Sequence, residues 1–305
     1  MKKPNFFIAG APRCGTTAFY TYLAAHPNIF MSEVKELNYF ADDFQGNQKI
    51  SFQSLDDYLK LFSGAGSEHI MVGEASPFYL FSKVAFSNMY RYDSKAKIIL
   101  TLRNPVDFVQ SFHRLNLSLL REDEGDLRKA WELEDERSEG RNVPKSCREP
   151  ALILYRELGL FGKHVERLLS IFPRHQVKVI IFEDFTSDPQ AAYESVLSFL
   201  GVPSDGRTEF PMINVRFENR FALLARVFHP PQSIYKMFMK VVSIFGVGFM
   251  KNVSKVYNII ERLNTTTVSR TPLAPGFRKE LLDYFRNDIL KLSNLIDLDL
   301  DHWLA

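Results

Sequence analysis

Four short apolar runs divide the chain into alternating strand and helix segments. The runs span residues 6–9, 70–73, 97–102 and 177–182. Their apolar residues are consecutive rather than alternating, which is typical of strands buried on both faces of a parallel sheet. Helical spacing of apolar residues recurs between and after these runs, most clearly over 277–296, and start and stop signals predict a helix over 189–200. The pattern therefore predicts strands alternating with helices.

This alternation predicts an α/β fold of three layers, in which a central, mostly parallel sheet is flanked by helices. We expect the fold to resemble that of P-loop proteins, because the first strand leads into a glycine-bearing loop and a helix. With 305 residues, the chain is expected to form a single domain over 1–305. Ligands on such sheets bind at the carboxyl ends of the strands.

Two segments depart from the alternation. Residues 121–149 carry ten acidic and seven basic side chains and few large apolar ones, which predicts a solvated, mobile excursion. Residues 221–263 are apolar and predict a helical insertion. That insertion is interpreted as core, as an acceptor pocket or as a peripheral membrane contact.

The net charge and the cysteine content exclude some classes of function. A net charge of +2 argues against general nucleic-acid binding. Cys14 and Cys147 are far apart and give neither metal-ligand spacing nor a disulfide framework. A reducing, cytoplasmic setting is therefore expected.

The loop after the first apolar run has the features of an anion site. Gly10 and Gly15 allow tight turning and close approach, and Thr16 and Thr17 open a helix whose first-turn N–H groups face the loop. Arg13 adds a cation. The glycine spacing matches a P-loop, but Thr16 stands where the P-loop lysine would be.

A second anion site is predicted after the run 97–102. Arg103 follows that run, and Ser111 lies two turns into the next helix. Two separate anion sites suggest a ligand with phosphates at both ends of a nucleoside. A P-loop small-molecule kinase is the alternative, in which Asp184 would bind magnesium.

Several motifs occur in the order found in one known family. They are Pro12-Arg13-x-Gly15-Thr16-Thr17, Lys35-Glu36-x-x-x-Phe40, Glu74-Ala75-Ser76-Pro77-x-Tyr79, Leu102-Arg103-Asn104-Pro105 with Ser111, Leu154-Tyr155-x-x-x-Gly159 and Phe182-Glu183-Asp184-Phe185. Over about residues 5–205 the chain resembles the sulfotransferases that use 3′-phosphoadenosine 5′-phosphosulfate (PAPS). The resemblance is greatest to the branch of heparan-sulfate sulfotransferases and their bacterial relatives.

The resemblance implies a set of residues that bind PAPS. The set comprises Arg13, Cys14, Gly15, Thr16, Thr17, Ala18, Arg103, Ser111, Tyr155, Arg216 and Arg220. The residues from 13 to 18 would cradle the 5′-phosphosulfate, and Arg103 with Ser111 would hold the 3′-phosphate. Arg13 occupies the place of the family's usual lysine, and an arginine keeps the charge but does not readily give up a proton.

The resemblance also implies the catalytic roles. Glu36 matches the base that removes the acceptor's proton, Arg13 is the main cation and Lys35 a second one. His113 is the alternative base, because imidazole titrates near neutral pH. No metal is expected. The acceptor is expected to be a hydroxyl or amine of a small molecule, lipid or glycan, and a non-catalytic nucleotide-binding module is a further alternative.

Overall fold

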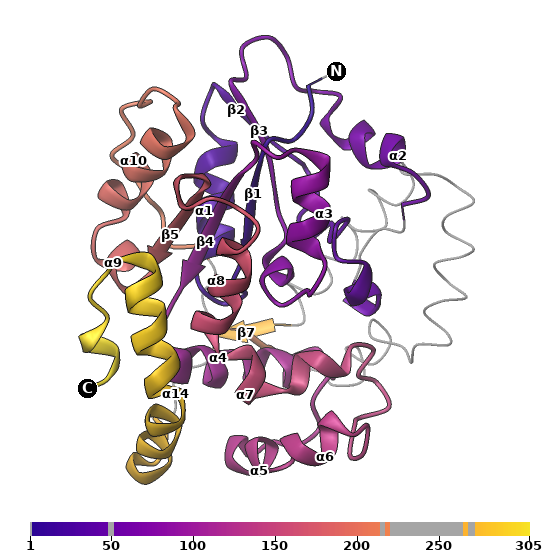
Figure 1. The fold of residues 1–305 in the computed structure, drawn as a ribbon, viewed down its shortest axis with the longest axis vertical. Coiled ribbons are helices and arrows are strands. Elements are labelled where there is room, and N and C mark those ends of the chain that lie inside the picture. The colour runs from indigo at the N-terminus through magenta and orange to yellow at the C-terminus, as the bar shows by residue number, and fades with distance from the viewer. Residues whose placement is uncertain (1, 48–51, 214–216, 220–264, 268–271) are drawn as a thin grey trace.

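Five parallel strands form one sheet at the centre of the molecule (Figure 1). The computed structural model describes residues 2–47, 52–213, 217–219, 265–267 and 272–305. The strands are β1 (Phe6–Gly10), β2 (Ile29–Met31), β3 (Met71–Ala75), β4 (Lys97–Leu102) and β5 (Val177–Ile181), in the order β2-β3-β1-β4-β5. The four predicted strands are confirmed, and the three-residue strand β2 is an addition.

Strand β1 lies in the middle of the sheet and is buried on both faces. It pairs with β3 on one side and with β4 on the other. Phe6 and Ile8 belong to one apolar cluster, whereas Phe7 and Ala9 belong to the cluster on the opposite face. Two buried faces explain why the run is apolar at every position.

Helices cover both faces of this sheet, so the predicted three-layer fold is confirmed. The helices are α1 (Thr16–Ala24), α2 (Leu55–Leu59), α3 (Ala85–Tyr92), α4 (Pro105–Ser118), α5 (Leu127–Glu132), α6 (Glu134–Ser138), α7 (Tyr155–Leu158), α8 (Phe161–Leu169), α9 (Phe182–Ser187), α10 (Pro189–Leu200) and α14 (Pro275–Ile296). Helices α1, α9 and α10 pack on the Phe6 face, and α3, α4, α8 and α14 on the Phe7 face.

Shorter elements complete the described chain. The 3₁₀ turns are η1 (Asp42–Asn47), η2 (Lys60–Phe62), η3 (Pro77–Leu80), η4 (Pro150–Ile153), η5 (Arg174–Gln176) and η6 (Asp301–Trp303). Strands β6 (Phe217–Asn219) and β7 (Thr265–Thr267) form an antiparallel pair. The predicted insertion over 221–263 lies outside the described residues. Among the described helices, none is both long and apolar enough to cross a membrane.

Two helix ends follow the local signals in the sequence. The Asn104 side chain accepts a hydrogen bond from the backbone N–H of Val106 at 2.9 Å, and Pro105 occupies the first position of α4. At the end of α10, Gly201 has φ 75°. An amide cap followed by proline begins a helix, and a left-handed glycine ends one.

The prediction of a solvated excursion over 121–149 is wrong. The segment folds into α5 and α6, which lie at the lower edge of Figure 1 below α7. Its Leu127 and Trp131 are buried, and the Trp131 ring contacts Phe285 of α14 with ring centroids 5.7 Å apart. The segment therefore contributes to the core despite its charge.

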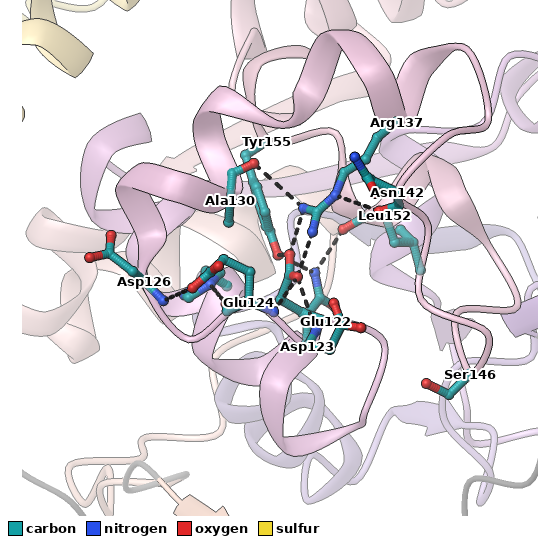
Figure 2. Close-up of polar contacts among 12 residues, drawn as sticks. Glu122, Asp123, Glu124, Asp126, Ala130, Arg137, Asn142, Ser146, Leu152 and Tyr155 are labelled. Carbon is teal, nitrogen blue, oxygen red and sulfur yellow. Dashed lines mark hydrogen bonds and ion pairs between the residues drawn. The ribbon is translucent and has the colours of Figure 1, made fainter.

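Burial of the charged segment depends on an ion pair (Figure 2). Arg137 donates two hydrogen bonds to Glu122, at 2.7 Å and 2.6 Å, and both side chains are 0% exposed. Tyr155 donates a third hydrogen bond to Glu122 at 3.0 Å. Burial alone would raise the pKa of Glu122, but the charge of Arg137 and the hydrogen bonds from Arg137, the backbone of Glu124 and Tyr155 together lower that pKa. Sequence composition does not reveal such pairing.

Removing one partner of this pair is expected to be costly. In the Arg137→Ala variant, the carboxylate of Glu122 stays buried without its cation, so we expect a loss of about 3–5 kcal/mol in the free energy of unfolding. The control is Arg141→Ala, whose partner Glu139 forms an exposed pair with it, and it should cost less than about 1 kcal/mol. Urea unfolding measures both, and equal losses would contradict the structural role of the buried pair.

Candidate active site

The loop between β1 and α1 is built around a left-handed glycine. Gly15 has φ 86°, and a Cβ there would lie 3.1 Å from ring atoms of both Phe182 and Phe185. Glycine is therefore required both by the backbone conformation and by the space. No side chain in the described part of the chain caps the N-terminus of α1. The N–H groups of its first turn can then face an anion.

Residues from two strand ends meet at this loop. Arg13, which follows β1 and has φ 64°, donates a hydrogen bond from Nε to Ser111 Oγ of α4 at 3.1 Å. Arg103, which follows β4, donates from Nη1 to the carbonyl of Arg13 at 3.4 Å. Residues expected from the sequence to belong to two anion sites are thus in direct contact at the carboxyl edge of the sheet.

Arg103 is held in a buried position beside this contact. It is 9% exposed, and its guanidinium lies over the Phe182 ring, 4.9 Å from the centroid. Its Nη2 is 3.9 Å from a carboxylate oxygen of Asp107. The Nε atom is buried and has no hydrogen-bond partner among the described residues. A buried N–H donor of this kind is costly unless a ligand accepts its bond.

Lys35 also reaches the opening of α1. Its ammonium donates to Thr17 Oγ1 at 2.7 Å and lies 5.3 Å from the centroid of the Tyr20 ring. Thr17 is the second residue of α1, so a cation stands next to the helix N-terminus. The predicted neighbours Arg13, Thr17 and Lys35 therefore belong to one region.

The segment that carries Glu36 is hydrogen-bonded to the end of β3 and to the turn that follows it. Glu36 is half-buried and has φ 62°, and its backbone N–H bonds to the carbonyl of Ala75 at 2.8 Å. Two residues on, the N–H of Asn38 bonds to Ser76 Oγ at 3.0 Å. The turn Glu74–Tyr79 was expected at this edge of the sheet, and it lies directly against the Glu36 segment.

A buried carboxyl group lies beneath that turn. Glu74 is fully buried and accepts hydrogen bonds from the hydroxyls of Tyr58, Tyr79 and Ser76 at 2.9, 2.7 and 3.0 Å. Burial raises the pKa of Glu74 to about 7, because it outweighs the three hydrogen bonds, which lower the pKa. No functional role was predicted for Glu74 from the sequence.

Two predicted site residues lie elsewhere. His113 is buried, its Nε2 is 2.8 Å from the carbonyl of Glu124, and burial lowers its pKa. Tyr155 is fully buried, contacts the His113 ring and donates to Glu122. His113 is two residues from Ser111, so the two side chains leave nearly opposite sides of α4. The structure groups both His113 and Tyr155 with the buried ion pair rather than with the Arg13 loop.

Other predicted residues are located as follows. Arg216 and Arg220 lie outside the described residues. Asp184, the magnesium ligand of the kinase alternative, is exposed on α9. Within the described ranges, no cluster of three or more histidine, cysteine or acidic residues is placed to hold a metal.

Two interactions of Asn104 were missed by sequence reasoning. Its backbone N–H bonds to Glu183 at 3.1 Å, and its side-chain amide donates to the carbonyl of Trp303 at 2.9 Å. Glu74 lies near the end of the apolar strand β3, and Glu183 follows the apolar strand β5. An acidic residue within an apolar strand end is a signal for a buried, hydrogen-bonded carboxylate.

The parallel sheet, the glycine loop and the arginines at its carboxyl edge define an α/β protein suited to an anionic ligand. The sulfotransferase domain family model matches residues 3–220. The chain therefore belongs to the sulfotransferase family, as the motifs predicted. Family and fold support sulfotransfer as its activity rather than the kinase alternative.

Relatives at moderate identity agree with this assignment. The crystal structure of a sulfotransferase from Alicyclobacillus acidocaldarius matches with a TM-score of 0.71 and 28% identity, covering 100% of both chains. Human bifunctional heparan sulfate N-deacetylase/N-sulfotransferase 3 is 28% identical over 207 residues, which is 65% of this chain and 22% of that protein. Membrane-associated sulfotransferase kil1 of Dictyostelium discoideum is 29% identical over 118 residues, which is 39% of this chain and 24% of that protein. The chain thus spans less than a quarter of these two curated relatives.

Gly15 and Gly201, two of the left-handed glycines at helix ends, provide a matched test of the loop. Gly201→Ala should cost about 1–2 kcal/mol of unfolding free energy, because its positive φ disfavours a Cβ while nothing lies within 4 Å. Gly15→Ala should cost a further amount of about 1–3 kcal/mol, because its Cβ also meets two rings. Chemical denaturation compares the variants, and an equal cost would show that the rings do not restrict residue 15.

The raised pKa of Glu74 predicts a pH-dependent contribution to stability. The neutral acid is favoured in the folded state, so its contribution is fully present below the ordinary glutamate pKa of 4.5 and is lost as pH rises to about 7. Relative to Glu74→Gln, the wild type should lose about 3 kcal/mol of unfolding free energy across that window. A difference between the two proteins that does not change with pH would contradict this assignment.

Proposed function

We propose that this sulfotransferase transfers a sulfuryl group from PAPS to a hydroxyl or amine, with in-line attack by the acceptor. The observation that carries the proposal is the contact of Arg13, Ser111 and Arg103 at the carboxyl edge of the sheet. Cations and a hydroxyl from two neighbouring strand ends suit a ligand that carries more than one anionic group.

The residues present fit this donor. Gly15 supplies the left-handed turn of the loop, and Thr16 and Thr17 open α1, so this part of the loop suits the 5′-phosphosulfate. The buried N–H of Arg103, which has no partner among the described residues, suits the 3′-phosphate. Burial raises the pKa of Cys14 to about 12, so its thiol would stay neutral.

The chemistry divides among three side chains. The bound donor would supply an activated sulfuryl group and a phosphate leaving group. Glu36 would remove the proton from the acceptor, and Arg13 with Lys35 would stabilise the charge that grows on the leaving oxygen. Because arginine stays protonated, the role of Arg13 is electrostatic rather than that of an acid. Glu36 is preferred to His113, whose Nε2 lies against a backbone carbonyl.

The acceptor and the cellular setting are part of the same proposal. The acceptor is a hydroxyl or amine of a small molecule, a lipid or a glycan. The names of several relatives refer to heparan sulfate or carbohydrate, which favours a glycan among these. We further propose one domain over 1–305, a cytoplasmic location and, through 221–263, a peripheral membrane contact. The last two rest on cysteine usage and apolar composition alone.

Two variants should show that donor binding and turnover depend on different residues. Arg103→Ala should weaken the binding of 3′-phosphoadenosine 5′-phosphate by about 10- to 100-fold, because it removes a charged hydrogen-bond donor. Glu36→Gln should leave this affinity unchanged and lower turnover by about 10²- to 10⁴-fold, because it removes the base. Calorimetry measures the affinity, and transfer of labelled sulfate to components of a cell extract measures turnover.

The control for Arg103 is Arg128→Ala, which removes a half-exposed arginine paired with Glu280. It should affect neither affinity nor turnover. A folded wild-type protein that failed to bind the nucleotide at high micromolar concentration would refute PAPS as the donor. Normal turnover by Glu36→Gln would refute only the assignment of the base.

A further inference from the structure

Alternate backbone N–H groups of residues 36–40 bond to the turn after β3. The N–H of Glu36 bonds to the carbonyl of Ala75 at 2.8 Å, and that of Asn38 bonds to Ser76 Oγ at 3.0 Å. The N–H of Phe40 lies 3.4 Å from the hydroxyl of Tyr79. Two of the three acceptors are therefore side-chain hydroxyls, which can in principle donate as well as accept.

The carboxylate of Glu74 fixes the direction of both hydroxyls. Ser76 Oγ donates to Glu74 Oε2 at 3.0 Å, and the Tyr79 hydroxyl donates to Oε1 at 2.7 Å. A hydroxyl has one hydrogen, so a hydroxyl that donates to Glu74 presents only lone pairs to the backbone N–H groups. At pH values above about 7, where Glu74 is mostly ionised, its carboxylate accepts hydrogen bonds and donates none. It therefore makes acceptors of the two hydroxyls that hold the segment.

We propose that Glu74 is a positioning residue for the transfer reaction, because it orients Ser76 and Tyr79 so that they hold residues 36–40 and direct Glu36 toward the acceptor. The proposal rests on the proposed role of Glu36 as the base. Glu74 itself is fully buried beneath the turn and acts only through its neighbours.

The conformation of the segment explains why it must be held. Glu36 has φ 62° and Asn38 has φ 50°, which are left-handed conformations that cost free energy for residues other than glycine. Without its bonds to the turn, the segment would relax toward ordinary backbone angles and move the Glu36 side chain. A displacement of about 1 Å in a reacting group can lower a rate by about 100-fold.

A glutamine at position 74 would keep the shape but not the polarity. Its amide nitrogen would be a donor in place of one acceptor oxygen, so either Ser76, which donates to Oε2, or both tyrosines, which donate to Oε1, would have to turn their hydrogens elsewhere. If Ser76 turned, its Oγ would accept from the glutamine amide, which would compete with the N–H of Asn38 for the same lone pairs. The Glu74→Gln substitution therefore tests the direction of the hydrogen bonds at residue 74 rather than the size of its side chain.

Tyr58 provides a matched control for these substitutions. Like Tyr79, it is fully buried and donates to Glu74 Oε1, at 2.9 Å. Its hydroxyl accepts no hydrogen bond from residues 36–40 among the bonds described for this segment. Tyr58→Phe thus removes a hydrogen bond to the same carboxylate without removing an acceptor for the segment.

The experiment compares Glu74→Gln, Ser76→Ala and Tyr58→Phe by amide hydrogen exchange and by labelled-sulfate transfer from PAPS, at about pH 8, where Glu74 is mostly ionised because its pKa is about 7. In Glu74→Gln and Ser76→Ala, exchange at Asn38 should become faster and turnover should fall by about tenfold or more. The affinity for 3′-phosphoadenosine 5′-phosphate should be unchanged. A variant that had lost its fold would bind the nucleotide more weakly, so this measurement separates the two explanations. Tyr58→Phe should keep wild-type exchange at Asn38 and wild-type turnover.

Two results would overturn the proposal. One is wild-type exchange and turnover in Ser76→Ala, and the other is an equal loss in Tyr58→Phe and Ser76→Ala. An error in the assignment of Glu36 as the base would be recognised separately. In that case the Glu36→Gln variant would have wild-type turnover. Faster exchange at Asn38 in Glu74→Gln, but not in Tyr58→Phe, would still support the holding of the segment by Glu74.

Discussion

Burial of β1 on both faces of an all-parallel sheet is the constraint on which the site depends. With β3 on one side and β4 on the other, the segments that leave these three strands all emerge at the same edge. Helices on both faces prevent these segments from turning back over the sheet. The anion loop, the Glu74 turn and the Arg103 turn must therefore share one edge, although up to about ninety residues separate them in sequence.

At that edge, the backbone takes conformations that most side chains disfavour. Arg13, Gly15, Glu36 and Asn38 all have positive φ. Only one of them is glycine, so the others depend on hydrogen bonds from neighbouring segments to keep their shape. Stability and reactivity are thus coupled at the edge, because the bonds that hold the backbone also decide where the charged side chains point.

Most of the sheet and of the donor loop could be predicted from the sequence because their signals are local. Apolar runs mark β1, β3, β4 and β5, and glycine spacing marks the loop. Strand β2 has only three residues and gives too little pattern to recognise. Glu122 and Arg137 are 15 positions apart in a segment whose composition predicts exposure to solvent. Their ion pair is buried only by tertiary packing, which the sequence does not reveal.

The hydrogen bonds of Asn104 carry a consequence for how the molecule forms. This residue caps α4, bonds to Glu183 and donates its amide to the carbonyl of Trp303, which lies 199 positions further along the chain. A chain made from its N-terminus releases residue 303 long after residue 104. The turn beside Arg103 is therefore completed only after residue 303 has been made, so a nascent chain could form its sheet before this turn was complete.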